Sequence, residues 1–183
     1  MKPFFQIIPS IPKEKFNMKV VLREWKKSDA DELAKIANNK KVWDNVRDRL
    51  PHPYTKKDAK EWLALVKKQK VVTTFCIEAD GNLAGSIGVT LKDDVYKRTA
   101  EIGYFVGEEY WGKGIATEAI KQMVDYIQKN FDVVRIYAEV FEYNKASMKV
   151  LEKNGFYLEC IRKKAAIKNN EIIDDYVWVK LLD

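Results

Sequence analysis

A glycine-containing turn at residues 107–119, GEEYWGKGIATEA, carries residue types that suit the binding of a charged ligand. Gly112 and Gly114 allow the backbone to approach a ligand closely and to adopt φ values that side chains disfavour. A helical pattern begins at Ile115, so its first free N–H groups would point at the ligand, with the positive end of the helix dipole behind them. Because this geometry binds phosphate, the turn predicts a phosphate-bearing ligand.

Two nucleotide-binding loops fit this turn less well. A Walker A loop starting at Gly107 needs Ser or Thr at its eighth position to hold Mg²⁺, and the chain has Gly114 there. A dinucleotide fingerprint needs a third glycine or alanine, and the chain has Thr117 there. A structural turn that binds no ligand is the other alternative that the residues leave open.

The segments that must position this turn alternate between strand and helix patterns. Strand patterns cover residues 19–23, 72–79, 82–91, 98–106, 133–141, 156–168 and 171–181. Helix patterns cover residues 28–37 and 55–66, each opened by a capping box, a short segment at 42–45, a long helix from Ile115, and residues 144–154. Asp80-Gly81 and Asn169-Asn170 predict hairpin turns. This order favours a mixed α/β fold with a mostly antiparallel twisted sheet flanked by helices.

The composition indicates a single domain over residues 1–183, with residues 1–17 as an N-terminal extension. Hydrophobic residues make up 46% of the 183 positions, which is enough for a core. No apolar run reaches the length of a membrane span, and the N-terminus lacks the pattern of a secretory signal. Cys76 and Cys160 lie in apolar, strand-like segments without metal-ligand spacing, so we expect two buried thiols and a cytoplasmic protein.

The charge balance permits an anionic ligand without requiring one. Lysine and arginine number 33 against 27 acidic residues, which gives a net charge of +6. Most of the lysines fall on helix faces, where a solvated charge is the ordinary explanation. Because no RNP-like, helix-turn-helix or zinc pattern accompanies them, the sequence argues against nucleic-acid binding.

Two motifs in order give the chain a resemblance to a known family. Residues 109–114, EYWGKG, match the pyrophosphate loop [QR]-x-x-G-x-[GA] except at Glu109, and residues 144–156, NKASMKVLEKNGF, form a second signature. The sequence thereby resembles the GNAT superfamily of N-acetyltransferases, in the branch that includes the ribosomal-protein N-terminal acetyltransferases. The resemblance covers residues 19–182 and implies the GNAT acyl-CoA N-acyltransferase fold. It also implies direct transfer of an acetyl group from acetyl-CoA to a primary amine, with no metal.

The resemblance assigns most of the cofactor contacts to backbone groups. The expected pyrophosphate contacts are Gly112, Lys113, Gly114, Ile115, Ala116 and Thr117. The pantetheine arm would pair with Phe105, Val106 and Gly107, and the Val106 N–H would polarise the thioester carbonyl. Asn144 would contact the pantetheine amides, although capping of a helix explains this residue as well. Glu109 is assigned no phosphate contact, because a carboxylate beside a pyrophosphate is unfavourable.

Glu101 and Ser147 are the candidate catalytic residues. An alkyl ammonium is no nucleophile at neutral pH, so a base helps the reaction, and Glu101 lies on the strand that leads into the turn. The alternative for Glu101 is an exposed carboxylate or an ion-pair partner. Many relatives place a tyrosine acid where this chain has Leu151, so Ser147 is the expected proton donor to the leaving thiolate. Ser147 could instead cap a helix, and Tyr157 is the weaker candidate acid.

The acceptor pocket is expected near the proline-bounded segment at residues 43–54. Its candidate substrate contacts are Trp43, Asn45, Val46, Arg47, Asp48 and Tyr54, and core packing is the alternative for Trp43 and Tyr54. His52, between two prolines, is expected to be exposed. The expected partners are acetyl-CoA and an amine acceptor, either a protein N-terminus or a small amine such as an aminoglycoside. A non-catalytic acyl-CoA-binding domain is the rival function, and the chain could be a monomer or a homodimer.

Overall fold

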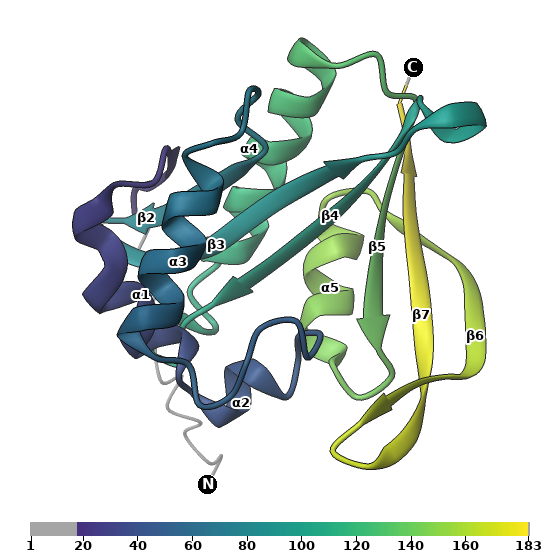
Figure 1. Cartoon of the computed structure of the whole chain (residues 1–183). Helices are drawn as coiled ribbons and strands as arrows, with labels where there is room; N and C mark the ends of the chain where they lie inside the picture. The colour runs from purple at the N-terminus through teal and green to yellow at the C-terminus, as the bar shows by residue number, and fades with distance from the viewer. Residues whose placement is uncertain (1–17, 183) are drawn as a thin grey trace, which may run out of the picture.

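The computed structural model describes residues 18–182, which form one seven-stranded sheet with helices on both faces (Figure 1). The strand order is β1-β2-β3-β4-β5-β7-β6. The strands are β1 (Val20–Arg23), β2 (Thr74–Ala79), β3 (Asn82–Leu91), β4 (Thr99–Val106), β5 (Arg135–Phe141), β6 (Tyr157–Lys168) and β7 (Glu171–Leu181). All pairs are antiparallel except β4 with β5, so the predicted mixed α/β fold is confirmed.

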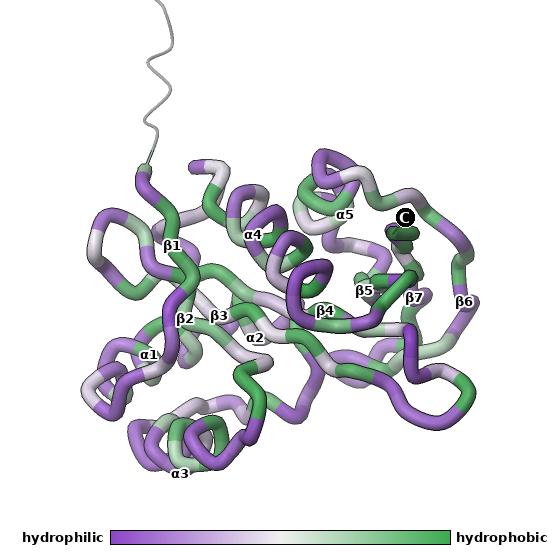
Figure 2. The backbone as a smooth tube through the Cα atoms, turned by 90° about the horizontal axis from the view of Figure 1, so that it is seen from above, coloured by the Kyte–Doolittle hydropathy of each residue, from purple (hydrophilic) through white to green (hydrophobic). Residues whose placement is uncertain are grey.

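Within residues 18–182, five α-helices cover the two faces of the sheet. They are α1 (Ala30–Ala37), α2 (Lys40–Trp43), α3 (Lys56–Val66), α4 (Ile115–Asn130) and α5 (Lys145–Lys153). Figure 2 shows α4 and α5 on one side of the strands and α1 and α3 on the other. Each side has its own hydrophobic core, because the apolar stripes of α4 and of α1 pack on opposite faces of the same strands.

The pairing between β4 and β5 is unusually short. Parallel contacts join only Thr99–Glu101 of β4 with residues 135–137 of β5, although both strands continue further. Figure 1 shows the two strands diverging beyond this point. Within residues 18–182, no strand pairs with the remainder of β4 on its β5 side. The sheet therefore has an opening in its middle, bordered by backbone groups without a strand partner.

Most of the predicted turns and caps are present. Asp80 and Gly81 both have positive φ, 48° and 84°, and so do Asn169 and Asn170, which is the backbone that two-residue hairpin loops require. Thr55 and Asp58 form the predicted capping box of α3. The expectation that the extension at residues 1–17 precedes a single domain stays a prediction, because those residues lie outside the described part.

Three local predictions need correction. The capping box expected at Ser28 is wrong: the Asp29 carboxylate accepts the Lys26 N–H at 2.8 Å, and α1 begins only at Ala30. The short helix near residues 42–45 begins earlier, with Asn39 as its cap. Cys160 is exposed rather than buried, because it lies on β6, an edge strand with an irregular register at that point.

Among the described residues, no helix is long and apolar enough to cross a membrane. The cytoplasmic location inferred from cysteine usage stays a prediction. Of the two thiols, Cys76 is fully buried, and burial raises its pKa to about 12.

Candidate active site

The predicted anion-binding turn connects β4 to α4. A 3₁₀ turn at Glu108–Tyr110 follows β4, and Gly112 and Gly114 then adopt the left-handed region with φ of 73° and 80°. Gly114 is the N-cap of α4, and no side chain caps the helix there. A glycine at this position permits the turn without strain and leaves the first N–H groups of α4 facing outward.

Side chains around the turn support it rather than cover it. The Trp111 indole Nε1 donates to the Val106 carbonyl oxygen at 2.7 Å, which ties the turn back onto β4. The Lys113 ammonium lies 5.6 Å from the centre of the Tyr110 ring, on the exposed side of the loop. Glu109 is exposed as well. Ile115 is buried in the core, while Ala116 and Thr117 are half-buried at the start of α4.

The free edge of β4 carries the predicted pantetheine contacts. Phe105 and Val106 pair with Ser86 and Gly85 of β3, and the Gly107 N–H donates to the Ala84 carbonyl at 2.8 Å. Because hydrogen-bonded and non-hydrogen-bonded pairs alternate along an antiparallel ladder, the Val106 N–H points away from β3 and into the opening. This orientation is the one that a thioester-polarising donor needs.

Gly85 is the residue that lets β3 approach this part of β4. A Cβ atom at Gly85 would lie 2.2 Å from the Phe105 carbonyl oxygen, which is too close for any other residue. The shape of the β4 edge therefore depends on a glycine in the neighbouring strand.

The start of α5 faces β4 from the other side of the opening. The Asn144 side chain accepts the Ser147 N–H at 3.0 Å, so both residues make the capping contact that was the alternative to a cofactor contact. The Ser147 hydroxyl also lies 2.7 Å from the Tyr104 hydroxyl. Burial raises the pKa of Tyr104 to about 12, although the contact with Ser147 opposes the rise, so Tyr104 keeps its proton at neutral pH.

Tyr104 was missed by the sequence reasoning. Strand alternation could have found it, because Tyr104 falls on the face of β4 opposite to Glu101 and on the same face as Ile102. Leu151, where many relatives have a tyrosine acid, is fully buried in the core and has no polar group to offer. The exposed ring of Tyr157 lies on β6, the edge strand.

Glu101 lies where β4 and β5 begin to diverge, opposite Tyr137 of β5. Its carboxylate accepts from Lys92 at 2.7 Å, from the Tyr137 hydroxyl at 3.0 Å and from Arg47 at 2.5 Å. Burial raises the pKa of this carboxyl, but the bonds from Lys92 and Tyr137 and the charge of Arg47 outweigh it, so the pKa lies below its usual value. Glu101 is thus an ionised carboxylate with three donors around it.

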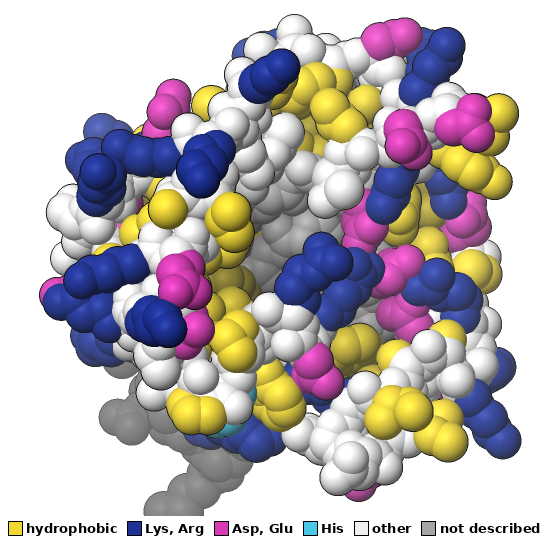
Figure 3. Space-filling model, viewed as in Figure 1, with side chains coloured by type: hydrophobic (Ala, Val, Ile, Leu, Met, Phe, Trp, Pro, Cys, Tyr) yellow, Lys and Arg dark blue, Asp and Glu magenta, His cyan; other side chains and the backbone are white. Residues whose placement is uncertain are grey.

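Charged residues continue from Glu101 across the same face of the sheet. Arg47 also bonds Glu139 of β5 at 2.5 Å, and Arg162 of β6 joins Glu139 at 2.6 Å to Asp175 of β7. Figure 3 shows basic side chains standing next to acidic ones on this face, over the region of β5 to β7. No sequence pattern groups Glu139, Arg162 and Asp175, because only the register of three distant strands brings them together.

The other predicted acceptor contacts hold the last hairpin in place. The buried Lys168 ammonium lies 3.3 Å from the centre of the Trp43 ring, and it donates to the Val46 carbonyl at 2.9 Å and to Asp48 at 2.5 Å.

Tyr54 is buried in the core under α1 and α3. Among the six residues predicted to contact the substrate, Arg47 is the one that bonds Glu101. The Asn45 side chain bonds the Lys41 carbonyl, and His52, which is exposed, stacks on Trp43.

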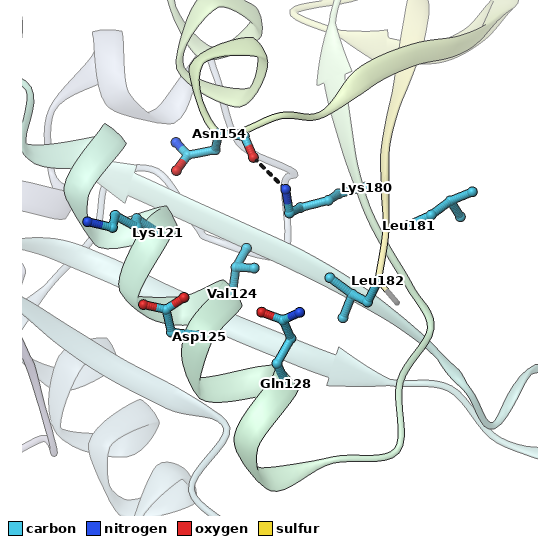
Figure 4. A pocket seen from close by; sticks show the side chains of 8 residues that line it. All are labelled: Lys121, Val124, Asp125, Gln128, Asn154, Lys180, Leu181 and Leu182. Carbon is cyan, nitrogen blue, oxygen red and sulfur yellow. Dashed lines mark hydrogen bonds between the residues drawn. The ribbon is translucent and has the colours of Figure 1, made fainter.

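Two surface pockets lie beside these elements. One of about 360 Å³ adjoins the turn and is lined by residues that include Ile36, Asn39 and Gly107. The other, of about 300 Å³, lies between α4 and the end of β7, where Lys180 donates to the Asn154 carbonyl at 3.0 Å (Figure 4). Within residues 18–182, no group of three or more His, Cys, Asp or Glu side chains is arranged to hold a metal ion.

Comparison with known proteins places the chain in a family. A family model described as an acetyltransferase (GNAT) domain matches residues 19–157. The chain belongs to the GNAT acetyltransferase family. The matched region contains the predicted anion-binding turn, the free edge of β4 and the start of α5, so the GNAT domain includes every predicted cofactor contact. It ends before β7, which carries Asp175.

Relatives of this GNAT domain differ in what they are named for. Probable N-acetyltransferase YjcK of Bacillus subtilis is 37% identical over 105 residues, 57% of this chain and 58% of YjcK. Spermidine N(1)-acetyltransferase of Escherichia coli is 33% identical over 85 residues, 46% of this chain and 45% of that protein. The aligned segments thus span about half of these relatives.

A solved ribosomal L7/L12 alpha-N-protein acetyltransferase, in complex with coenzyme A, has the same fold. It superposes with a TM-score of 0.80 at 20% identity, covering 90% of this chain and 94% of that one. At this level of identity, the superposition shows that the two chains share the GNAT fold.

Proposed function

We propose that this protein transfers the acetyl group of acetyl-CoA directly to a primary amine in the opening between β4 and β5. The observation that carries the proposal is the arrangement around the free edge of β4. Glu101 lies on one face of this strand, while the Tyr104–Ser147 hydroxyl pair lies on the other. A thioester along the edge would thus have a carboxylate on the acceptor side and two hydroxyls on the thiol side.

The cofactor is held mainly by backbone groups in this proposal. The outward N–H groups at residues 112–117 bind the pyrophosphate, with the dipole of α4 behind them. The pantetheine arm pairs with β4 at residues 105–107, and the Val106 N–H donates to the thioester carbonyl as negative charge develops there. The support is the geometry of the turn and the missing strand partner beyond Glu101.

Glu101 removes the proton that the amine must lose. Holding an alkyl amine neutral at pH 7 costs about 4 to 5 kcal/mol, so an acceptor for the proton is needed near the nitrogen. The ammonium first loses one proton to solvent and becomes a neutral amine. The amine nitrogen then attacks the thioester carbonyl carbon, a C–N bond forms, and the second proton of the nitrogen passes to Glu101, directly or through water. The C–S bond then breaks, and its electron pair leaves on the sulfur.

The Tyr104–Ser147 pair stabilises the leaving thiolate. A tyrosine whose pKa is about 12 remains a neutral O–H donor, so it donates to Ser147 or to the sulfur throughout the neutral range. A thiol has a pKa of about 8.5, well below that of Tyr104, so the tyrosine keeps its proton. The pair therefore gives the sulfur a hydrogen bond rather than a complete proton. Ser147, fixed by its backbone bond to Asn144, is the member nearer to the helix end.

The acceptor is a small amine or a protein N-terminus. The name of the spermidine acetyltransferase favours the first, and the name of the ribosomal L7/L12 acetyltransferase favours the second. We favour the small amine, because the carboxylates around the opening suit a compact cation more than a peptide backbone. A peptide beginning with serine or alanine is the probe for the second class.

Two measurements test the proposed function. Acetyl-CoA at millimolar concentration should raise the melting temperature, and free thiol should appear when a panel of amines is added. Absence of any thermal shift would contradict the cofactor assignment. Binding without thiol release across amines, amino acids and peptides would instead support a non-catalytic acyl-CoA-binding domain.

A further inference from the structure

A single nitrogen of Arg47 lies between carboxylates from the two diverging strands. Arg47 Nη2 is 2.5 Å from Glu101 Oε1 and 2.5 Å from Glu139 Oε2. The carboxylate side chains are 15% and 19% exposed, whereas the arginine side chain, from the turn after α2, is 60% exposed. Two anions are therefore fixed by the sheet, and the cation between them reaches in from a surface turn.

A third carboxylate on this face lacks a partner for one of its oxygens. The Asp175 side chain is 5% exposed, and its Oδ2 accepts from Arg162 Nε at 2.9 Å. Its buried Oδ1 has no hydrogen-bond partner in the part of the chain that the structure describes. A buried carboxylate oxygen needs a donor, so the group that would complete this site carries an N–H or O–H.

The charges of the site also favour a cation over an anion. Glu101, Glu139 and Asp175 face the cations Arg47, Lys92 and Arg162, which makes the group neutral as it stands. Arg47 is the most exposed of these cations and the one that comes from a turn. If its guanidinium moves out, three carboxylates face two cations, and a cationic ligand restores the balance.

We propose that Arg47 is a displaceable stand-in for the acceptor, and that the acceptor is an aliphatic diamine or polyamine. The reacting amine enters between Glu101 and Glu139, at the position that Arg47 Nη2 holds in the free protein. A second ammonium group of the same molecule donates to Asp175 Oδ1. This inference rests on the proposed function and adds to it the class of the acceptor and the residues that select it.

The first test compares two acceptors that differ by one charge. With saturating acetyl-CoA, kcat/KM for 1,4-diaminobutane should exceed that for n-butylamine by about tenfold or more in the unaltered protein. Equal values, or a higher value for a peptide N-terminus or an amino acid, would overturn the inference and leave the proposed acetyl transfer intact. If acetyl-CoA binds and no acceptor releases thiol, the proposed function itself fails.

The second test uses Arg47→Ala, with Arg98→Ala as the matched control. Arg98 pairs with Asp132 on the surface and takes no part in the site. Loss of a competing cation should lower the KM for 1,4-diaminobutane about fivefold, with kcat changed less than threefold, and the control should change neither. A raised KM in Arg47→Ala would overturn the inference, because it would make Arg47 a substrate ligand.

The third test is Asp175→Asn, which removes the charge and keeps the shape. The KM for the diamine should rise about tenfold while the KM for n-butylamine stays within twofold. An equal rise for both amines, or no rise for either, would contradict a second ammonium site at Asp175. If this variant does not fold, judged by its melting curve, the diamine-to-monoamine ratio and the Arg47→Ala result still decide the inference.

Discussion

The two faces of β4 are built in different ways. On the cofactor face, the proposed contacts come from residues 104–117 and from the start of α5, so they depend on short stretches of backbone. On the acceptor face, Arg47, Glu101, Glu139 and Asp175 come from separate segments that only the finished sheet brings together. The cofactor side therefore depends on local backbone conformation, while the acceptor side is a set of paired charges that one substitution can alter.

The largest effect should follow from removing the charge of Glu101 on the acceptor face. Glu101→Gln should lower kcat by about 10²- to 10⁴-fold, because a positioned base contributes on this scale. The Kd for acetyl-CoA should stay within twofold, since Glu101 lies on the acceptor face. Glu61→Gln on the surface of α3 is the control, and steady-state kinetics with calorimetry provide both numbers. If the Kd for acetyl-CoA rises by as much as kcat falls, the two faces do not act separately in cofactor binding and catalysis.

A smaller effect is expected from the hydroxyl pair on the cofactor face. Ser147→Ala and Tyr104→Phe should each lower kcat about ten- to a hundredfold, the value of a hydrogen bond to a charged group. Because the two hydroxyls are 2.7 Å apart and act as a unit, the double variant should lose little more than either single one. Strictly additive losses, measured with a good amine acceptor, would show that the residues act independently.

The turn itself can be tested with a pair of glycines. Gly114→Ala and Gly81→Ala both place a side chain at positive φ in open space, so each should lower the free energy of unfolding by about 1–2 kcal/mol. Gly114→Ala should also weaken acetyl-CoA binding, whereas Gly81→Ala, in the β2–β3 hairpin, should not. Denaturant unfolding and calorimetry measure the two properties. Equal acetyl-CoA affinities in the two variants would contradict a cofactor role for the turn.

The mildest expected effect is on the pH profile. The pKa of Glu101 lies below its usual value, so the carboxylate is charged above about pH 4.3 and any stability it adds is lost only as the pH falls below that range. The rise of kcat/KM between pH 6 and 9 should therefore follow the pKa of the acceptor amine. Amines of lower pKa should shift the midpoint downward, and a midpoint that ignores the amine would contradict this assignment.

Local patterns explain why much of the fold could be predicted. The hairpins at Asp80-Gly81 and Asn169-Asn170, the capping box at Thr55 and the glycine turn at residues 112–114 each depend on a few neighbouring residues. Cys160 was mispredicted because its exposure depends on the position of β6 at the edge of the sheet, which no local pattern encodes.

The same contrast applies to the candidate site. Glu101 could be predicted as the candidate base because it lies in an apolar strand next to the turn. Its three hydrogen-bond donors could not be predicted from the sequence. Lys92, Tyr137 and Arg47 reach it from a loop after β3, from β5 and from the turn after α2. Trp43 and Asp48 were expected near a substrate, and they instead hold Lys168, a contact across 120 residues for Asp48. Side-chain pairing over such separations is decided by the topology.

The most direct test of the separation between the two faces is hydrogen–deuterium exchange with and without saturating acetyl-CoA. We expect slower exchange in peptides that cover residues 102–117 and 144–147, where backbone amides would bind the cofactor, and no change in residues 44–50. Protection confined to residues 44–50, or exchange in residues 102–117 that acetyl-CoA leaves unchanged, would contradict this expectation.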